Sequence, residues 1–199
     1  PARTVQELVA LVRSQPGKFS YSSGGIGFSQ HRAGELMNSM AGLDMVHVPN
    51  PGNSWPDVIT GRTQLLFGNI ALALPMVKDG KVRALAVTSS TRASAAPELP
   101  TVSESGLPGF ESLSWFGVLA PAGTPPAVLQ RLEAELQKAM AAPAMKERLA
   151  TMGAMPGVQN AAGFTQVIQN EIKRWAPKPG SAVAAVPSPA AVTATVQKP

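Results

Sequence analysis

The chain has 199 residues, 44% of them hydrophobic and 15% charged, so it is long enough to bury a core and is unlike a disordered acidic chain. The formal net charge of +5 comes from lysines and arginines scattered singly, without the basic stripe and interleaved aromatics that bind nucleic acid. Cysteine is absent, which excludes disulfides and thiolate chemistry, and no stretch is typical of a membrane span or a signal peptide.

The first half of the chain alternates predicted helices and strands. Thr4 to Glu7 has the spacing of a capping box and opens the first helix, which stops at Pro16-Gly17. A strand around Phe19 and Tyr21, a glycine-rich turn and a helix opened by Ser29 follow. The later predicted elements are strands over 44–48, 64–67 and 82–88 and helices over 55–60 and 70–78.

Four successive strand-helix units predict an α/β fold with a doubly wound parallel sheet. The segment 82–88 is dense enough in apolar residues to indicate a strand buried on both faces. Ligands of such sheets bind at the carboxyl ends of the strands. The loops after the predicted strands are therefore the candidate site.

The glycine-rich turn before Ser29 has the composition of an anion-binding loop. Gly24, Gly25 and Gly27 permit tight turns, and no acidic residue precedes Glu35 in this part of the chain. The free amides of the following helix turn would favour a carboxylate or phosphate. The alternative is that Ser29 is only an N-cap and His31 only a hydrogen-bonded first-turn residue, and the loop alone leaves both hypotheses open.

Two enzymatic interpretations of the same loop fit poorly. A dinucleotide fingerprint needs a third glycine where the chain has Gln30, and an acidic residue about twenty positions later. The segment 27–31 imitates a nucleophile elbow, but histidine replaces its last glycine. A serine hydrolase using Ser29 would also need an acid and a later histidine, and the only later one is His47, within a predicted strand.

Asparagines follow two of the other predicted strands. Asn50 and Asn53 lie in one loop and Asn69 in the next, so their amides would converge on one crevice, although ordinary turn chemistry explains them equally well. No cluster of histidines and carboxylates has metal-ligand spacing near these loops. We therefore expect no metal and no cofactor.

The second half of the chain has a different pattern. Thr101 to Glu104 is a second capping box, 114–120 is a predicted apolar strand, and Thr124 is the expected cap of a long helix. The apolar stripe of that helix predicts core packing. Two more helices are expected over 143–152 and 162–175, and the tail 176–199 has the composition of a disordered segment.

Three segments together resemble a known family. SSGGIGFSQHRAGELMNSMAGLDMVHVP, QLLFGNIALALPMVKDGKVRALAVTSSTR and LPTVSESGLPGFESLSWFGVLAPAGTP look like the Bug-type substrate-binding receptors of tripartite tricarboxylate transporters. The resemblance implies a two-lobed periplasmic binding protein that hands small organic acids to membrane transporter subunits and performs no chemistry. It assigns residues 4–112 to the second lobe, 113–175 to part of the first lobe, and 176–199 to a tail.

The resemblance also implies which residues meet the ligand, a dicarboxylate, tricarboxylate, acidic amino acid or aromatic carboxylate. The family's carboxylate loop corresponds to Ser22, Ser23, Gly25, Gly27, Ser29 and His31, and the neighbouring loops contribute Asn50 and Asn69. Phe28 replaces a residue that is usually small and polar. Because the front of the first lobe has no counterpart here, we expect weak binding or none by this chain alone, and a truncated product with only interaction roles is the alternative.

Overall fold

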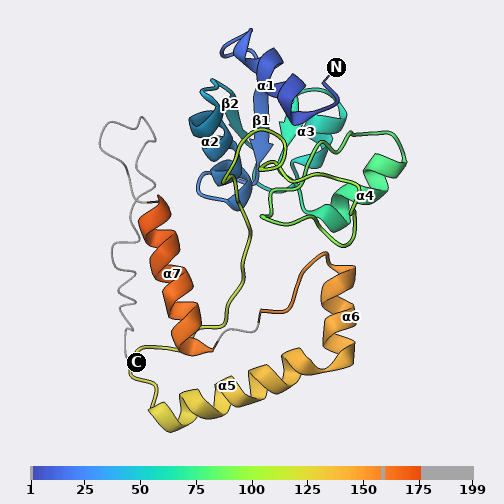
Figure 1. The fold of residues 1–199 in the computed structure, drawn as a ribbon. Helices are drawn as coiled ribbons and strands as arrows, with labels where there is room; N and C mark the ends of the chain where they lie inside the picture. The colour runs from blue at the N-terminus through green and yellow to red at the C-terminus, as the bar shows by residue number, and fades with distance from the viewer. Residues whose placement is uncertain (1, 158–159, 176–199) are drawn as a thin grey trace. The chain divides into compact units, whose positions relative to one another are not determined.

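The computed structural model describes residues 2–157 and 160–175, drawn as a ribbon in Figure 1. The chain divides into two compact units, Pro1–Val158 and Gln159–Pro199. The elements of the first unit are α1 (Val5–Arg13), β1 (Ser20–Ser23), α2 (Ser29–Ala41), β2 (Val46–Pro49), α3 (Trp55–Ile59), β3 (Leu65–Leu66), α4 (Ile70–Lys78), α5 (Pro126–Ala141) and α6 (Pro143–Thr151). The second unit contains α7 (Ala161–Trp175).

Two expectations about the ends of these units stay predictions. The tail 176–199 lies outside the described residues. The lobe boundary expected at residue 112 is likewise untested. No helix within residues 2–157 or 160–175 has the length and apolar character that crossing a bilayer requires.

The start of α1 confirms the first capping signal. Thr4 is the N-cap, and its hydroxyl oxygen accepts the backbone N–H of Glu7 at 3.1 Å. The Glu7 carboxylate in turn accepts the N–H of Arg3 at 2.7 Å. The N–H of Glu7, one of the amides that a helix start leaves without an intrahelical partner, is thus satisfied locally, and the bond from Arg3 fixes the residue that precedes the cap.

The strands form a three-stranded parallel sheet in the order β2-β1-β3. In the register, Tyr21 of β1 lies opposite His47 of β2 and Leu65 of β3. β1 is therefore the central strand, with hydrogen-bonded neighbours on both sides, and the carboxyl ends of the three strands meet at one edge of the sheet. The predicted α/β fold with a parallel sheet is confirmed.

Helices cover both faces of this sheet, and consecutive residues of β1 show it. Tyr21 turns to α2, where its hydroxyl donates to Glu35 at 2.6 Å. Ser22 points to the opposite face, as strand geometry requires, and its hydroxyl donates to the carbonyl of Ser54 at the start of α3. This is the doubly wound arrangement that the sequence predicts, and the helices around the sheet can be followed in Figure 1.

The hydrophobic core lies on the Tyr21 face. It joins three parts of the chain: α1, the β1-α2 unit, and an irregular segment after residue 100. The buried members are Val5, Leu8, Val12, Tyr21, Met37, Ala41, Met45, Val102, Leu107 and Phe110. The segment is stabilised by the second capping box, in which Thr101 and Glu104 exchange backbone-to-side-chain hydrogen bonds of 2.9 and 3.0 Å.

The prediction of a fourth strand over 82–88, buried on both faces, is wrong. Among the described residues this segment makes one parallel bridge, between Val87 and Thr101, and its apolar side chains are only partly buried. Val87 donates to the carbonyl of Pro100 and accepts from the N–H of Val102. An apolar run favours burial, but a ladder also needs a neighbouring strand in register, and β3 has only two residues.

The predicted strand over 114–120 is also wrong, because that segment belongs to no described strand. Its apolar side chains are exposed, with Phe116 94% and Leu119 75% accessible. Thr124 is not the cap of α5: the N-cap is Pro125, and the Thr124 hydroxyl donates to the carbonyl of Pro121.

The apolar stripe of α5 is exposed rather than packed. Val128, Leu129, Leu132 and Leu136 are each between 41% and 48% accessible. The prediction of core packing for this stripe therefore fails within the described residues. An uncovered apolar stripe of this kind favours association with another surface.

Candidate functional site

The glycine loop leaves the carboxyl end of β1 and enters α2. Gly25 and Gly27 have φ angles of 144° and 85°, in the region that a side chain rarely adopts. The sequence thus forms the tight turn that its glycines predicted, and it forms it at the sheet edge where ligands of parallel sheets bind.

The amides of the loop itself are engaged within the protein. The N–H of Gly24 donates to Oε1 of Gln30 at 3.0 Å, and the N–H of Gly25 donates to Oγ of Ser23 at 3.1 Å. The N–H of Gly27 donates to Nδ1 of His31 at 3.1 Å. These amides hold the shape of the loop, so a ligand would have to use other donors or displace these contacts.

The first turn of α2 offers such donors. Phe28 is the N-cap and makes no side-chain capping bond, and the first intrahelical bond runs from the N–H of Arg32 to the carbonyl of Phe28 at 2.9 Å. Ser29 is therefore the first helical residue, and the hypothesis that it is the N-cap is wrong. The amides of residues 29–31 precede the first intrahelical bond at the positive end of the helix dipole.

Ser22 and Ser23 are fully buried at the end of β1. The Ser22 hydroxyl donates to Ser54 O at 3.3 Å and lies 3.2 Å from the hydroxyl of Thr63. The Ser23 hydroxyl lies 2.6 Å from Nε2 of His47. Both hydroxyls are thus held inside the lobe, where they support the loop.

The two histidines lie together beside the loop. The ring centroids of His31 and His47 are 4.1 Å apart, and Tyr21 stacks on His47 at 5.1 Å. Burial lowers the pKa of His31, which the nearby Glu35 carboxylate opposes. Burial and then the neighbouring His31 lower the pKa of His47. Both imidazoles are therefore biased toward the neutral form at neutral pH.

These contacts do not support the hydrolase hypothesis. The histidine nitrogens with described partners serve the loop: Nδ1 of His31 accepts from Gly27, and Nε2 of His47 lies beside the buried Ser23. A nucleophilic serine needs a base on its own hydroxyl and access to substrate. Ser23 has no such access, and no described contact joins Ser29 to a histidine.

The loop after β2 is held by a carboxylate that the sequence analysis did not single out. Asp57 of α3 is 2% exposed and accepts the side-chain N–H of Asn50 at 2.6 Å and that of Arg62 at 2.8 Å. Asn50 also donates to the carbonyl of Asn53 at 3.2 Å. Asn50 is thus near the strand ends as predicted, but its amide is engaged with α3.

Asn69 has a structural role at the start of α4. It is the N-cap, and its Oδ1 accepts the N–H of Ala71 at 2.9 Å. The side-chain NH2 group is a separate feature of the same residue, since capping uses only the oxygen. The structure thus shows the cap and leaves the predicted ligand contact untested.

Replacing Asn69 separates these two roles. Asn69→Ala should lower the free energy of unfolding by about 1 kcal/mol, whereas Asn69→Ser should keep it, because serine caps about as well as asparagine. Urea unfolding measures both. Equal losses of unfolding free energy in the two variants would show that Asn69 does not stabilise the protein through its cap. Weaker ligand binding by the stable Asn69→Ser variant would assign the NH2 group to binding.

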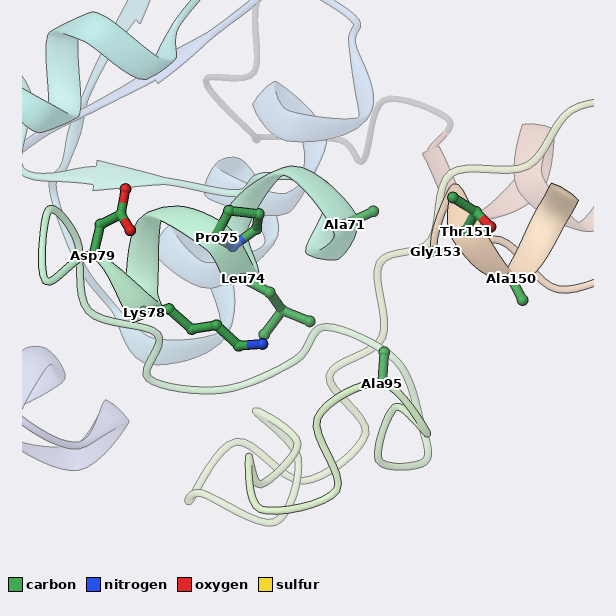
Figure 2. A pocket seen from close by; sticks show the side chains of 9 residues that line it. All are labelled: Ala71, Leu74, Pro75, Lys78, Asp79, Ala95, Ala150, Thr151 and Gly153. Atoms are coloured by element: carbon green, nitrogen blue, oxygen red, sulfur yellow. The ribbon is translucent and has the colours of Figure 1, made fainter. Parts of the chain in front are cut away.

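A cavity lies elsewhere in the described part of the chain. About 480 Å³ of space borders α4, the segment of Ala95 and the end of α6. Figure 2 shows Leu74 and Lys78 extending from α4 toward the chain that carries Ala95. None of the eight predicted ligand residues lines this cavity, so it is separate from the candidate site.

Comparison with known proteins identifies the family of this chain. A family model described as tripartite tricarboxylate transporter family receptor matches residues 1–178. A UPF0065 protein from the tcbD-tcbE intergenic region of Pseudomonas sp. strain P51 is 39% identical over 180 residues, which cover 87% of this chain and 52% of that protein. The chain therefore spans about half the length of this relative.

Two solved structures are similar in fold. R. palustris Rpa4515 with adipate has a TM-score of 0.79 and 31% identity, and the match covers 88% of this chain and 59% of that one. The periplasmic binding protein BugD has a TM-score of 0.75 and 30% identity, with coverage of 88% and 60%. Together with the family match, they confirm the resemblance seen in the sequence: the chain belongs to the tripartite tricarboxylate transporter receptor family.

Proposed function

We propose that this chain carries the carboxylate loop of a periplasmic solute-binding receptor, which captures a small organic acid and delivers it to membrane transporter subunits. The family match and the adipate held by a structural neighbour support this proposal. The family and its solved neighbours are binding proteins. The chain matches only part of their length, so capture and delivery are properties proposed for the whole receptor.

The observation that carries the proposal is the set of amides in the first turn of α2. Those of Ser29, Gln30 and His31 precede the first intrahelical bond, and they lie where the loop meets the sheet edge. Each can donate to a carboxylate oxygen, and the helix dipole adds to the attraction. Ser22, Ser23, Gly25 and Gly27 shape the loop, and we propose that Ser29, His31, Asn50 and Asn69 border the ligand.

One helix turn can satisfy one carboxylate. A diacid would then meet its second carboxylate elsewhere, which fits a site shared between two lobes. If a complete receptor binds at about −8 kcal/mol and each lobe supplies half, one lobe holds about −4 kcal/mol, which corresponds to a millimolar dissociation constant. We therefore expect this chain alone to bind adipate with a millimolar dissociation constant at best, or not at all.

The test removes a single backbone donor. Ser29→Pro deletes the N–H at the first helical position, where proline breaks no intrahelical bond and is well tolerated. Phe28, with φ −63° and ψ 156°, already has the conformation required before proline. Adipate at ten times its dissociation constant should stabilise the wild-type chain by about 1.4 kcal/mol, and Ser29→Pro should weaken binding about tenfold.

Ser29→Ala is the matched control, because it removes the hydroxyl and keeps the amide. Thermal melts with and without adipate, at equal ionic strength, measure the stabilisation. A shift that survives in Ser29→Ala and falls to about 0.4 kcal/mol in Ser29→Pro at the same adipate concentration supports binding at the helix turn. Loss in both variants would assign the contact to the hydroxyl, and the absence of a shift in the wild type would contradict binding by this chain and favour the non-functional alternative.

A further inference from the structure

Two imidazoles fasten the glycine loop at two separate points. Nδ1 of His31 accepts the N–H of Gly27 at 3.1 Å. Nε2 of His47 lies 2.6 Å from the hydroxyl of Ser23, and that hydroxyl accepts the N–H of Gly25 at 3.1 Å. Each histidine thus holds one of the two glycines whose backbone angles make the turn.

The contact to Gly27 depends on the protonation state of His31. A backbone N–H can only donate, so Nδ1 must carry a free lone pair, and the neutral ring must carry its proton on Nε2. Protonation converts Nδ1 into a donor that faces another donor. The Gly27 contact then cannot persist, and the loop loses one of its two attachments to a histidine.

The surroundings of His31 and His47 disfavour protonation of both rings at once. The rings are 4.1 Å apart, so two positive charges would repel strongly at this distance. The titratable and charged groups that the described interactions place beside them are Tyr21 from β1, which stacks on His47, and Glu35 from α2, whose carboxylate acts on both rings. Glu35 is the one nearby carboxylate among them, and it accepts the hydroxyl of Tyr21 at 2.6 Å.

We propose that His31 is a positioning residue that fastens the carboxylate loop at Gly27 only while its imidazole is neutral, and that this attachment is released when His31 takes up a proton in acid. The contact of His47 with Ser23 is compatible with either protonation state, because the Ser23 hydroxyl donates to the carbonyl of Gly25 and can accept from Nε2–H. The inference rests on the proposed function only in taking this loop as the ligand site. The histidines act on the loop through the backbone amides of Gly25 and Gly27. We call this arrangement the latch, because protonation of His31 removes a hydrogen bond that holds the loop.

The direction of the pH effect follows from linkage. Burial lowers the pKa of both histidines below the ordinary value of about 6.5, so the folded protein binds fewer protons than the unfolded chain. The stability associated with the neutral pair is complete above about pH 6.5. It is lost as the pH falls through the lowered pKa of the folded state.

NMR titration of the 199-residue chain from pH 8 to pH 5, without ligand, tests the proposal. The histidine Cε1–Hε1 signals report the protonation of each ring, and the amide signal of Gly27 reports its hydrogen bond. We expect His31 to titrate below pH 6.5 and the Gly27 amide to shift with the same midpoint. A His31 midpoint at or above 6.5, or a Gly27 amide that does not follow it, would overturn the proposal.

His31→Gln provides the matched variant, because glutamine can accept a hydrogen bond from Gly27 but does not titrate. In this variant the Gly27 amide should lose its pH dependence, and the midpoint of His47 should rise because a neighbouring charge is removed. A Gly27 amide that titrates as in the wild type would contradict the role of His31. If the variant does not fold, the wild-type titration alone still decides.

This experiment is independent of the ligand. A loop that titrates as described in a chain that binds no adipate would support the latch and count against the proposed function. If adipate binds, its apparent affinity should fall about twofold between pH 7.5 and the midpoint of His31, where half of the molecules have lost the Gly27 contact. Adipate affinity that stays constant across that midpoint would overturn control of the site by the latch.

Discussion

Gly34→Ala is expected to destabilise the protein by about 2 kcal/mol, because the new methyl group would overlap the ring of Tyr21. Tyr21 is fully buried, its hydroxyl is bonded to Glu35, and its ring lies between His47 and Phe67. It therefore has little room to move. The better helix propensity of alanine, about 1 kcal/mol, offsets only part of the steric cost.

Urea unfolding of Gly34→Ala measures this loss, with Ser39→Ala on the exposed side of α2 as the control that should change little. A double-mutant cycle with Tyr21→Ala isolates the clash, since the Gly34→Ala cost should largely disappear once the ring is absent. If Gly34→Ala is as stable as the wild type, or equally destabilising in both backgrounds, close packing of α2 on β1 through Gly34 is contradicted.

Asp57→Ala should cost about 2–3 kcal/mol, the range for hydrogen bonds to a buried charged group. The Asp57 carboxylate is 2% exposed and accepts from both Asn50 and Arg62. Its removal leaves the Asn50 amide without this partner, so the loop after β2 should loosen as the protein loses stability. The side-chain amide signals of Asn50 and a urea melt report the two effects.

Arg62→Gln is the matched control for Asp57. The Arg62 side chain is 73% exposed, so its ion pair with Asp57 is screened by water and should contribute less than about 1 kcal/mol. A loss in Arg62→Gln equal to that in Asp57→Ala would show that the ion pair, rather than the bond to Asn50, holds this corner of the lobe.

Local signals predicted the first half of the fold well. Caps, glycines and prolines mark the limits of α1, α2 and α4, and these signals act within a few residues. The strand predictions for 82–88 and 114–120 were wrong because a strand exists only when a neighbouring strand pairs with it. Their apolar composition says that they favour burial, but it does not say which neighbour supplies the hydrogen bonds.

In the candidate site, too, features set by adjacent residues were predictable and features set by distant residues were not. The glycine loop and the helix start were visible in the sequence, since both depend on adjacent residues. The pairing of His31 with His47 was not, because it arises from the register that sets Tyr21 beside His47. The role of Asp57 was also missed, although an acidic residue in the first turn of a helix after an asparagine-rich loop was the available signal.

The core has a consequence for the order in which the protein is made. Val5, Leu8 and Val12 of α1 are covered by Val102, Leu107 and Phe110, about a hundred positions later in the chain. At a synthesis rate of about 5–20 residues per second, the apolar face of α1 waits roughly 5–20 s for its partners to be translated. During that interval the nascent lobe has its first helix but not the segment that covers it, so a chaperone that shields apolar surface would act at this stage.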